Sequence, residues 1–352
     1  MNILKILQIN TERGWRGGER QTLFTMKALA RAGQEVELLC LGGSTLARRA
    51  KEEFLPVREV KNQTGALSFL AIRGRDYDIL HAQTGRGQSL AVMSRPLHGR
   101  QVVYTRRVDF VPRGTLSLLK YHYTHQVVAI SSAIKDILED TLPGKKVEVI
   151  PSCLDTASSV RTPSPEALSL KKRLAPGKII ACAAALVPHK DPLTLVRAAA
   201  RLKENHDLDF VLLHFGRGPL EAEVRREISR LGLKRHYLLM GFEQDLESFF
   251  PVFDVFVMSS QEEGLGSSVL DAFRYKVPVV STNAGGLKDL VSGRGLICPV
   301  RDPDCLARSM NQVLRDPDSC LDMTRKAQAY VLREHGLEEM TRRYLRLYRE
   351  ML

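Results

Sequence analysis

The chain has 352 residues, of which 44% are hydrophobic and 26% charged. This length suits two domains better than one, and the composition excludes collagen-like, disordered and disulfide-scaffold proteins. The net charge is +12, and the first 160 residues, with 23 basic and 15 acidic side chains, account for +8 of it. Such a charge suits nucleic acid, an anionic membrane surface or phosphorylated small molecules, and does not choose among them.

The chain begins with an apolar run, residues 3–9, that leads directly into polar sequence. It lacks the small-residue cleavage site of a signal peptide, so we expect a first buried strand. No stretch approaches about eighteen apolar residues, so no transmembrane helix is expected. The six cysteines are scattered without a C-x-x-C pair, and we therefore expect a reduced, cytoplasmic protein without a zinc site.

Short apolar runs alternate with helical periodicity along the chain, the pattern of βαβ units and parallel sheets. A first series of strands is expected at residues 5–9, 35–40, 79–82, 101–104, 127–130 and 147–150. A second series is expected at residues 179–184, 210–214, 237–239, 255–258 and 278–280. A helix is expected at residues 19–32, and an apolar stripe predicts a final amphipathic helix at 337–351.

The polar stretch 152–165, rich in Pro, Ser and Thr, separates the two series and indicates a linker. The sequence thus predicts an α/β protein with two doubly wound Rossmann-like domains, residues 1–160 and 161–335. Ligands of such sheets bind beyond the carboxyl ends of the strands. We therefore expect the active site in a cleft between the two domains.

The strongest local motif follows the expected strand 255–258. Gly264 and Gly266 let the backbone approach a ligand, and a helix begins at Ser267 or Ser268, where free N–H groups suit a phosphate. Glu263 and Asp271 can each accept hydrogen bonds from hydroxyl groups. Carboxylates around a phosphate site favour a nucleotide-sugar over a bare phosphate. An ordinary N-cap turn with two solvated acids explains the same residues equally well.

A second glycine-rich turn, with Gly14, Gly17 and Gly18, lies between the first strand and the first helix. This is the usual phosphate-binding position of such a domain. The dinucleotide pattern G-x-G-x-x-G is absent and no P-loop lysine follows, so a plain βα turn is the alternative. Residues 216–219, Gly-Arg-Gly-Pro, form a third such turn after the strand 210–214.

Several motifs occur in a fixed order along the chain. They are Gly17-Gly18-Glu19, Asp78-Ile79-Leu80-His81-Ala82, Val149-Ile150-Pro151-Ser152, Val187-Pro188-His189-Lys190-Asp191-Pro192, Gly216-Arg217-Gly218-Pro219, Glu263-Gly264-Leu265-Gly266 with Asp271-Ala272, and Thr282-Asn283-Ala284-Gly285-Gly286. Together they resemble the group-1 family of retaining GT-B glycosyltransferases (family 4). The similarity runs from the first strand to past residue 300 and implies a GT-B fold, with the helix 336–352 packing back on the N-terminal domain.

The resemblance also implies roles for individual residues. Lys190 is expected to bind the donor diphosphate, and the backbone at Gly17 and Gly18 to close over the same phosphates. Glu263 and the amides that follow it are expected to hold the sugar hydroxyls, and Asp271 the ribose hydroxyls. The donor-binding set is then Gly17, Gly18, Lys190, Arg217, Glu263, Gly264, Leu265, Gly266, Ser267 and Asp271. The resemblance further implies a nucleoside-diphosphate sugar as donor, no cofactor, no catalytic metal, and retention with the leaving phosphate as base.

Three positions depart from the family pattern. Asp271 stands where the family has a longer glutamate. Ala185 stands where an arginine would contact the diphosphate, and Arg217 occupies a position that is often Asp. We hypothesise that Arg217 supplies the missing charge.

The N-terminal domain offers further candidates. His81 ends a strand and is a catalytic candidate if it faces the cleft, or else a structural histidine. Arg106, Arg107 and Arg113 are expected on the acceptor side, and one of the first two stands near a histidine of many relatives. Apolar residues beside them suit docking on anionic lipid, with a buried helix and a basic rim as the alternative. The D-x-D pattern at Asp76–Asp78 recurs elsewhere in the chain, so it predicts no metal site.

We therefore predict a metal-independent hexosyltransferase that is cytoplasmic or peripheral at the inner membrane face. Its partners are a nucleotide-sugar donor and a saccharide or lipid-linked acceptor, as in surface polysaccharide or lipopolysaccharide synthesis. The alternatives are a catalytically weakened nucleotide-sugar-binding subunit and a GT-B nucleotide-sugar epimerase. A nucleic-acid-binding protein is disfavoured, because neither aromatic platforms nor a helix-turn-helix or zinc pattern is evident.

Overall fold

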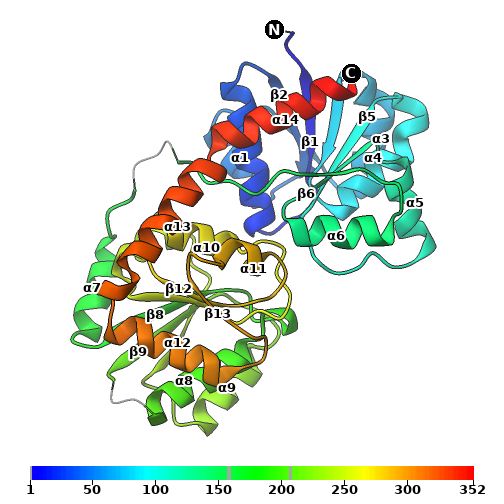
Figure 1. The fold of residues 1–352 in the computed structure, drawn as a ribbon. Coiled ribbons are helices and arrows are strands. Elements are labelled where there is room, and N and C mark those ends of the chain that lie inside the picture. Colours follow the sequence, from blue (N-terminus) through cyan, green and yellow to red (C-terminus); the bar gives the residue numbers. More distant parts are fainter. Residues whose placement is uncertain (1, 157–159, 206–207) are drawn as a thin grey trace. The chain divides into compact units, whose positions relative to one another are not determined.

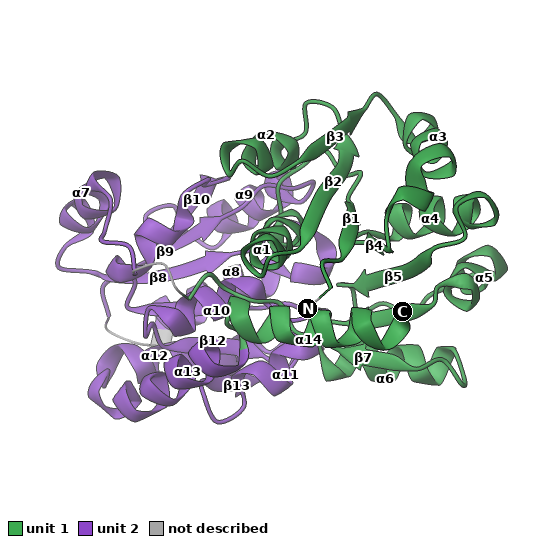
Figure 2. Cartoon of the chain, turned by 90° about the horizontal axis from the view of Figure 1, so that it is seen from above, with its two compact units in different colours: residues 1–157, 335–352 green, residues 158–334 purple. Residues whose placement is uncertain are grey.

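The computed structural model describes residues 2–156, 160–205 and 208–352 (Figure 1). The chain divides into two compact units, which are coloured separately in Figure 2. Unit 1 comprises residues 1–157 and 335–352, and unit 2 comprises residues 158–334. Residues 157–159 of the expected linker lie outside the described residues.

Unit 1 is built on a seven-stranded parallel sheet in the order β3-β2-β1-β4-β5-β6-β7. Its strands are β1 (Lys5–Ile9), β2 (Glu35–Leu41), β3 (Val57–Val60), β4 (Ile79–Ala82), β5 (Gln101–Arg106), β6 (Gln126–Ala129) and β7 (Val147–Val149). Its helices are α1 (Gly17–Arg31), α2 (Thr45–Glu52), α3 (Gln63–Arg73), α4 (Gly85–His98), α5 (Thr115–Tyr123), α6 (Ser132–Thr141) and α14 (Leu337–Met351). The strand order reverses direction between β1 and β4, so this is a doubly wound sheet.

Unit 2 contains a six-stranded parallel sheet in the order β10-β9-β8-β11-β12-β13. The strands are β8 (Lys178–Ala183), β9 (Phe210–Phe215), β10 (Tyr237–Gly241), β11 (Val255–Met258), β12 (Val279–Thr282) and β13 (Leu296–Cys298). The helices are α7 (Pro165–Leu174), α8 (Pro192–Asn205), α9 (Glu221–Arg230), α10 (Ser267–Arg274), α11 (Gly286–Val291), α12 (Pro303–Arg315) and α13 (Leu321–Glu334). The two parallel sheets confirm the predicted α/β class.

Two strands, β3 and β13, were not predicted from the sequence. Both lie at an edge of their sheet. The four residues of β3 are all partly or fully exposed, and β13 has only three residues. A short, half-exposed edge strand lacks the continuous apolar run by which a buried parallel strand is recognised.

The C-terminal helix α14 belongs to the core of unit 1 (Figure 1). Its stripe of Leu337, Met340, Tyr344, Leu347 and Tyr348 is buried in one cluster with Leu23, Met26 and Leu29 of α1. Burying side chains of this size contributes roughly 1.5–3 kcal/mol each. The last residues of the chain therefore complete the first domain rather than the second.

The expectation of a fully reduced chain is wrong at one pair of cysteines. Cys298 at the end of β13 and Cys305 in α12 form a disulfide, with Cα atoms 5.7 Å apart. The turn between β13 and α12 brings them together, at a spacing that matches no common motif. In the described part of the chain, no helix combines the length and the apolar character needed to cross a bilayer.

Candidate active site

The candidate site of unit 2 lies where β8 and β11, which are neighbours in the sheet, reach their carboxyl ends. The loops that follow these strands are joined by hydrogen bonds. Ser259 Oγ donates to the carbonyl oxygens of Lys190, at 3.1 Å, and Asp191, at 2.9 Å. The backbone N–H of Gln261 donates to the carbonyl of His189 at 2.8 Å. These bonds hold the two loops side by side.

Lys190 and Glu263, the two main donor candidates, form an ion pair within this site. Their side chains are 18% and 13% exposed, so the pair is mostly shielded but still reachable from solvent. Ser260 Oγ also approaches the Glu263 carboxylate, at 3.4 Å. A shielded ion pair at a sheet's carboxyl edge is a charged site that a polar ligand can enter by exchanging partners.

Lys190 is positioned by a short loop that begins the next helix. It ends the 3₁₀ turn Pro188–Lys190, and Asp191 follows in a left-handed conformation with φ 45°. The Asp191 carboxylate accepts from the Thr194 N–H, at 3.2 Å, and from Thr194 Oγ1, at 2.7 Å. This cap on the first turn of α8 fixes where Lys190 leaves the backbone.

The Glu263 loop is held by a close backbone approach at Gly286. The Gly286 N–H donates to the Glu263 carbonyl at 2.8 Å, and a Cβ on Gly286 would lie 2.3 Å from the Gly264 carbonyl oxygen. Only glycine permits this contact. Helix α10 then begins at Ser267 after Gly266, which has no side chain to cap it, so first-turn N–H groups are available to a ligand.

The remaining candidates of unit 2 lie in different environments. Asp271 is buried in α10, with 3% of its surface exposed. The turn with Arg217 packs directly on the loop after β8, because a Cβ on Gly216 would lie 2.0 Å from the Ala184 carbonyl oxygen. Arg217 itself is exposed, and its guanidinium lies beside Gly241.

In unit 1, the candidate residues lie after strand β1, in β4, and in or after β5. Gly17 and Gly18 begin α1, and the stem of Arg107 lies close to Gly18. Arg107 donates to Gln83 Oε1 at 2.5 Å and to Ser152 Oγ at 3.5 Å. Gln83, which the sequence did not indicate, therefore holds one of the predicted acceptor-side residues.

His81 is fully buried beneath this group. Its two ring nitrogens hydrogen-bond to the Tyr348 hydroxyl and to Thr105 Oγ1, each at 2.7 Å. Burial, and to a smaller extent the positive charge of Arg107, lower its pKa to about 3, so the ring is neutral near pH 7. Its catalytic role stays a prediction, and its contacts are those of a group that positions its neighbours.

Arg106 and Arg113 differ in exposure to solvent, although both were expected on the acceptor side. Arg106 is buried, and it donates to the carbonyls of Val108, at 3.0 Å, and Phe110 and to the Tyr121 hydroxyl. It therefore organises the loop after β5. Arg113 is exposed.

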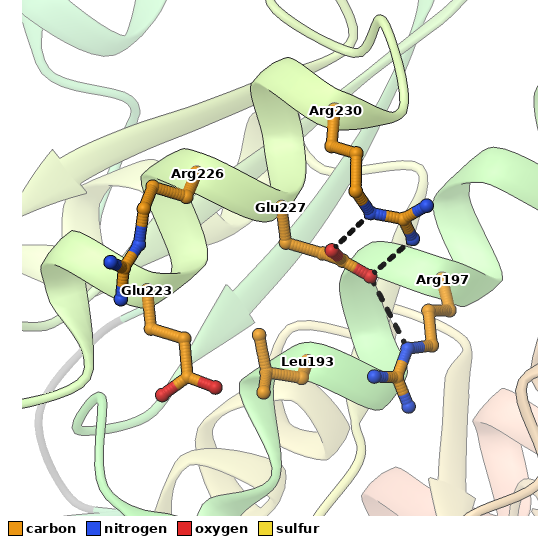
Figure 3. Close-up of a pocket in the computed structure, with 6 residues that line it drawn as sticks. All are labelled: Leu193, Arg197, Glu223, Arg226, Glu227 and Arg230. Carbon is orange, nitrogen blue, oxygen red and sulfur yellow. Dashed lines mark hydrogen bonds and ion pairs between the residues drawn. The ribbon is translucent and has the colours of Figure 1, made fainter.

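A surface hollow between α8 and α9 lies outside the predicted site (Figure 3). Leu193, Arg197, Glu223, Arg226, Glu227 and Arg230 line it. Glu227 at its centre is paired with Arg197, at 3.4 Å, and Arg230, at 2.8 Å. None of the predicted site residues contributes to it. Within the described ranges, no three His, Cys, Asp or Glu side chains are grouped as metal ligands.

Comparisons with known proteins place the chain in a family. The family model described as "Glycosyl transferases group 1" matches residues 169–330, and that described as "Glycosyltransferase Family 4" matches residues 15–158. The D-inositol 3-phosphate glycosyltransferase of Corynebacterium urealyticum is 26% identical over 342 residues, covering 86% of this chain and 78% of that protein.

Two further similarities agree. The UDP-Gal:alpha-D-GlcNAc-diphosphoundecaprenol alpha-1,3-galactosyltransferase of Escherichia coli is 25% identical over 275 residues, covering 76% of this chain and 68% of that protein. The crystal structure of Anabaena Alr3699/HepE in complex with UDP-glucose has a TM-score of 0.86 at 19% identity, over 99% of this chain and 100% of that chain. The chain therefore belongs to the group 1 glycosyltransferases of family 4 and has their GT-B fold.

Proposed function

We propose that this glycosyltransferase moves a hexose-type sugar from a nucleoside-diphosphate sugar to a saccharide or lipid-linked acceptor, with retention of the anomeric configuration. The observation that carries the proposal is the Lys190–Glu263 ion pair beside the N-terminus of α10. It offers one cation, one carboxylate and free N–H groups at one sheet edge, which suits a ligand with a diphosphate and several hydroxyls.

The proposed chemistry follows from what these groups can do. The Lys190 ammonium leaves Glu263 and pairs with the donor diphosphate, while the Glu263 carboxylate accepts hydrogen bonds from the sugar hydroxyls. As the bond between the sugar and the diphosphate breaks, negative charge grows on the leaving phosphate, and Lys190 stabilises it. That phosphate then takes the proton of the acceptor hydroxyl on the same face of the sugar. No metal and no cofactor enter this scheme.

Arg217 is the proposed second cation of the donor site. Its guanidinium is exposed at the carboxyl end of β9 and β10, on a turn that packs on the loop after β8. Arg217→Ala is expected to weaken donor binding about tenfold, the loss of one charge-assisted contact. An unchanged affinity would show that Arg217 does not replace the arginine missing at Ala185.

The names of the relatives suggest donor and acceptor classes. The Escherichia coli relative is named for a UDP-galactose donor and an undecaprenol diphosphate acceptor, and the HepE structure holds UDP-glucose. We propose the same classes here, a UDP-sugar and a lipid-linked saccharide, within surface polysaccharide or lipopolysaccharide synthesis.

The segment 108–123 of unit 1 supports a membrane-bound acceptor. Six of its apolar side chains are exposed, among them Leu116 at 83% and Phe110 at 57%, and Arg113 and Lys120 lie between them. In α5 the residue that is fully buried is Tyr121, which favours the exposed helix over the buried-helix alternative. Exposed apolar residues next to basic ones suit peripheral binding to anionic lipid at the cytoplasmic face.

One experiment separates the proposed function from its alternatives. The protein is incubated with UDP-, GDP- and ADP-sugars, with and without lipid extracts that supply acceptors, and release of nucleoside diphosphate is followed, with EDTA present in one arm. Release that depends on the acceptor supports the transferase. Nucleotide binding without any release favours the binding subunit, which the buried Asp271 and Ala185 motivate. Absence of nucleotide binding overturns the proposal.

A further inference from the structure

The loop between β13 and α12 is closed at its base by the disulfide between Cys298 and Cys305. The two cysteines lie seven positions apart, so the bridge directly constrains this short loop. Small secreted domains need several bridges to complete a weak core, whereas a chain of this length buries enough apolar surface without them. The bridge therefore acts locally. The remaining cysteines are buried free thiols, namely Cys40, Cys153, Cys182 and Cys320.

Arg301, inside this loop, has an unusual backbone conformation. Its φ is 61°, in the left-handed region that favours glycine over residues with a side chain. Strained residues of this kind persist where the surrounding structure holds them, and they cluster at functional sites. The exposed Arg301 side chain donates from Nη2 to Gln261 Oε1 at 2.6 Å. The strained residue thus reaches the loop that follows β11.

Gln261 lies where the two loops of the candidate donor site are joined. The N–H groups of Gln261 and Glu262 both donate to the carbonyl of His189, at 2.8 and 3.2 Å. His189 directly precedes Lys190. Glu263 lies two positions after Gln261. A hydrogen bond that fixes the Gln261 side chain therefore limits the movement of both loops.

The bridge is linked to Arg301 through the beginning of α12. The backbone N–H of Cys305 donates to the Asp302 carboxylate at 2.8 Å, which caps this helix. Asp302 directly follows Arg301. At the other end, Cys298 is held in the sheet, because its carbonyl accepts the Asn283 N–H at 2.9 Å. Two thiols cannot stay at bonding distance, so opening the bridge moves the loop and the cap rather than the strand.

The bridge can be reduced from the side of α12. Cys305 is partly exposed, whereas Cys298 is 1% exposed. A thiolate of an external dithiol attacks Cys305 Sγ, the S–S bond breaks, and Cys298 leaves as a thiolate. The Ser309 hydroxyl, 3.4 Å from Cys298 Sγ, can donate to this thiolate. The second thiol of the reductant then releases Cys305, so two electrons and two protons pass to the cysteines and the reductant leaves as a cyclic disulfide.

We propose that Arg301 is a positioning residue for the donor site and that the Cys298–Cys305 disulfide governs it. With the bridge closed, Arg301 holds Gln261 and thereby the two donor-site loops. A dithiol reductant opens the bridge, loosens this contact and weakens donor binding, although no group that touches the donor is altered. The effect on the donor rests on the proposed function, whereas the coupling of the bridge to the Gln261 loop does not.

Calorimetry with UDP as the probe tests the proposal on protein treated with oxidised glutathione or with dithiothreitol. Alkylation in denaturant counts the free thiols, and we expect four in the oxidised sample and all six cysteines in the reduced one. UDP affinity should be about fivefold lower in the reduced protein, the effect of losing one hydrogen bond. Six free thiols in the oxidised sample, or equal UDP affinities of the two forms, overturn the proposal.

Cysteine variants assign the response to this bridge. Cys305→Ser should bind UDP as the reduced wild type does and should not respond to dithiothreitol. Cys320→Ala removes a free cysteine of the same unit and is the matched control, which should keep the wild-type response. If Cys305→Ser still responds to dithiothreitol, another cysteine causes the effect and the proposal is overturned.

Arg301→Gly separates positioning from stability. Glycine adopts this φ without strain, so the melting temperature should not fall, while UDP affinity should fall about fivefold. Lys276→Gly is the matched control, because Lys276 is exposed in the same unit and has φ 55°, and it should bind UDP as the wild type does. Gln261→Ala should lose as much affinity as Arg301→Gly, and the double variant no more. Wild-type affinity in Arg301→Gly, or losses that add in the double variant, contradict the proposal.

A further measurement distinguishes a failure of this proposal from a failure of the proposed function. Binding of UDP in neither redox state contradicts the proposed function. Hydrogen exchange of the backbone at residues 259–264 then decides the present inference, and it should be faster in the reduced protein, with α9 as the unchanged internal reference. Equal exchange of residues 259–264 in the two redox states overturns the inference.

Discussion

The ammonium group of Lys190 contacts the carboxylate of Glu263, although the two residues lie 73 positions apart in the chain. Each side chain is the counter-ion of the other in the absence of ligand. We expect a diphosphate that binds Lys190 to compete with Glu263 for the ammonium group, and this exchange frees the carboxylate to accept hydroxyl groups. One contact thus couples the two halves of the proposed donor, its phosphates and its sugar.

Glu263→Gln should affect binding of the donor's phosphates and handling of its sugar differently. The substitution removes the counter-ion of Lys190, so UDP alone should bind at least as tightly as to the wild type. Turnover of the sugar donor should fall by roughly 10²-fold, since a neutral amide holds the sugar hydroxyls less strongly in the transition state. Calorimetry with UDP and steady-state kinetics measure the two effects. A parallel loss of UDP affinity and turnover would contradict this account.

Lys190→Ala should reduce both UDP affinity and turnover of the sugar donor. Removing the cation that we propose to stabilise the leaving diphosphate is expected to lower kcat/KM by roughly 10²–10³-fold. UDP affinity should also fall, because the ground-state contact is lost. Lys234→Ala, an exposed lysine of the same unit, serves as the control and should retain wild-type kinetics. A wild-type kcat/KM in Lys190→Ala would remove Lys190 from the mechanism.

Gly286→Ala should disturb the site without touching a charged group. The added Cβ would lie 2.3 Å from the Gly264 carbonyl oxygen, so the Glu263 loop has to move. We expect stability to fall by about 1–3 kcal/mol, the range for strained contacts, and turnover to fall with it. Gly14→Ala, where nothing lies within 4 Å of the new atom, should leave the melting temperature unchanged. Similar melting temperatures for both variants would show that the loops adapt freely.

Tyr348→Phe tests the link between α14 and the sheet of unit 1. The substitution leaves a buried nitrogen of His81 without its hydroxyl partner, which costs about 1–3 kcal/mol. The melting temperature should fall accordingly. Tyr123→Phe, with an exposed side chain in the same unit, should match the wild type. An equal response to both substitutions would mean that the hydroxyl contact adds nothing to stability.

Stability should decrease in acid because of His81. Its pKa is about 3 in the folded chain, where burial disfavours the charged ring, against 6.5 as the ordinary value. Below pH 6.5 the unfolded chain binds a proton that the folded chain does not, so the stabilisation is complete above pH 6.5 and is lost towards pH 3. The loss at pH 5 is about 2 kcal/mol. Denaturant unfolding of the wild type and His81→Asn at pH 7.5 and 5.0 measures it, and equal pH dependences would refute this origin.

The buried strands were predictable because each is a short, mostly apolar run in the sequence. β1, β4 and β11 begin and end at the predicted residues, and the final helix occupies residues 337–351 as its stripe indicates. Edge strand β3 has charged residues at its centre, and the apolar run of β13 is only three residues long. The local signal fails where burial, its physical cause, is incomplete.

The candidate site was predictable as a set of residues but not as an arrangement. Motif order named Lys190 and Glu263, whereas their contact depends on the pairing of β8 with β11 and on the bonds between the following loops. Nothing in the sequence distinguishes Arg106 from Arg107. In the fold, Arg106 binds carbonyl oxygens of its own loop, and Arg107 faces neutral side chains beside Gly18.

The sequence by itself determined the α/β class, two doubly wound sheets and a family resemblance, because buried strands and ordered motifs are local properties of the chain. The basic excess of the first 160 residues, +8, was also visible, but not its meaning. Only the tertiary structure decided which basic side chains of the chain have a counter-ion, since this depends on partners that are distant in the chain. It shows that Lys190 of unit 2 is paired with a carboxylate, whereas Arg107, among the described residues of unit 1, donates to the neutral side chains of Gln83 and Ser152.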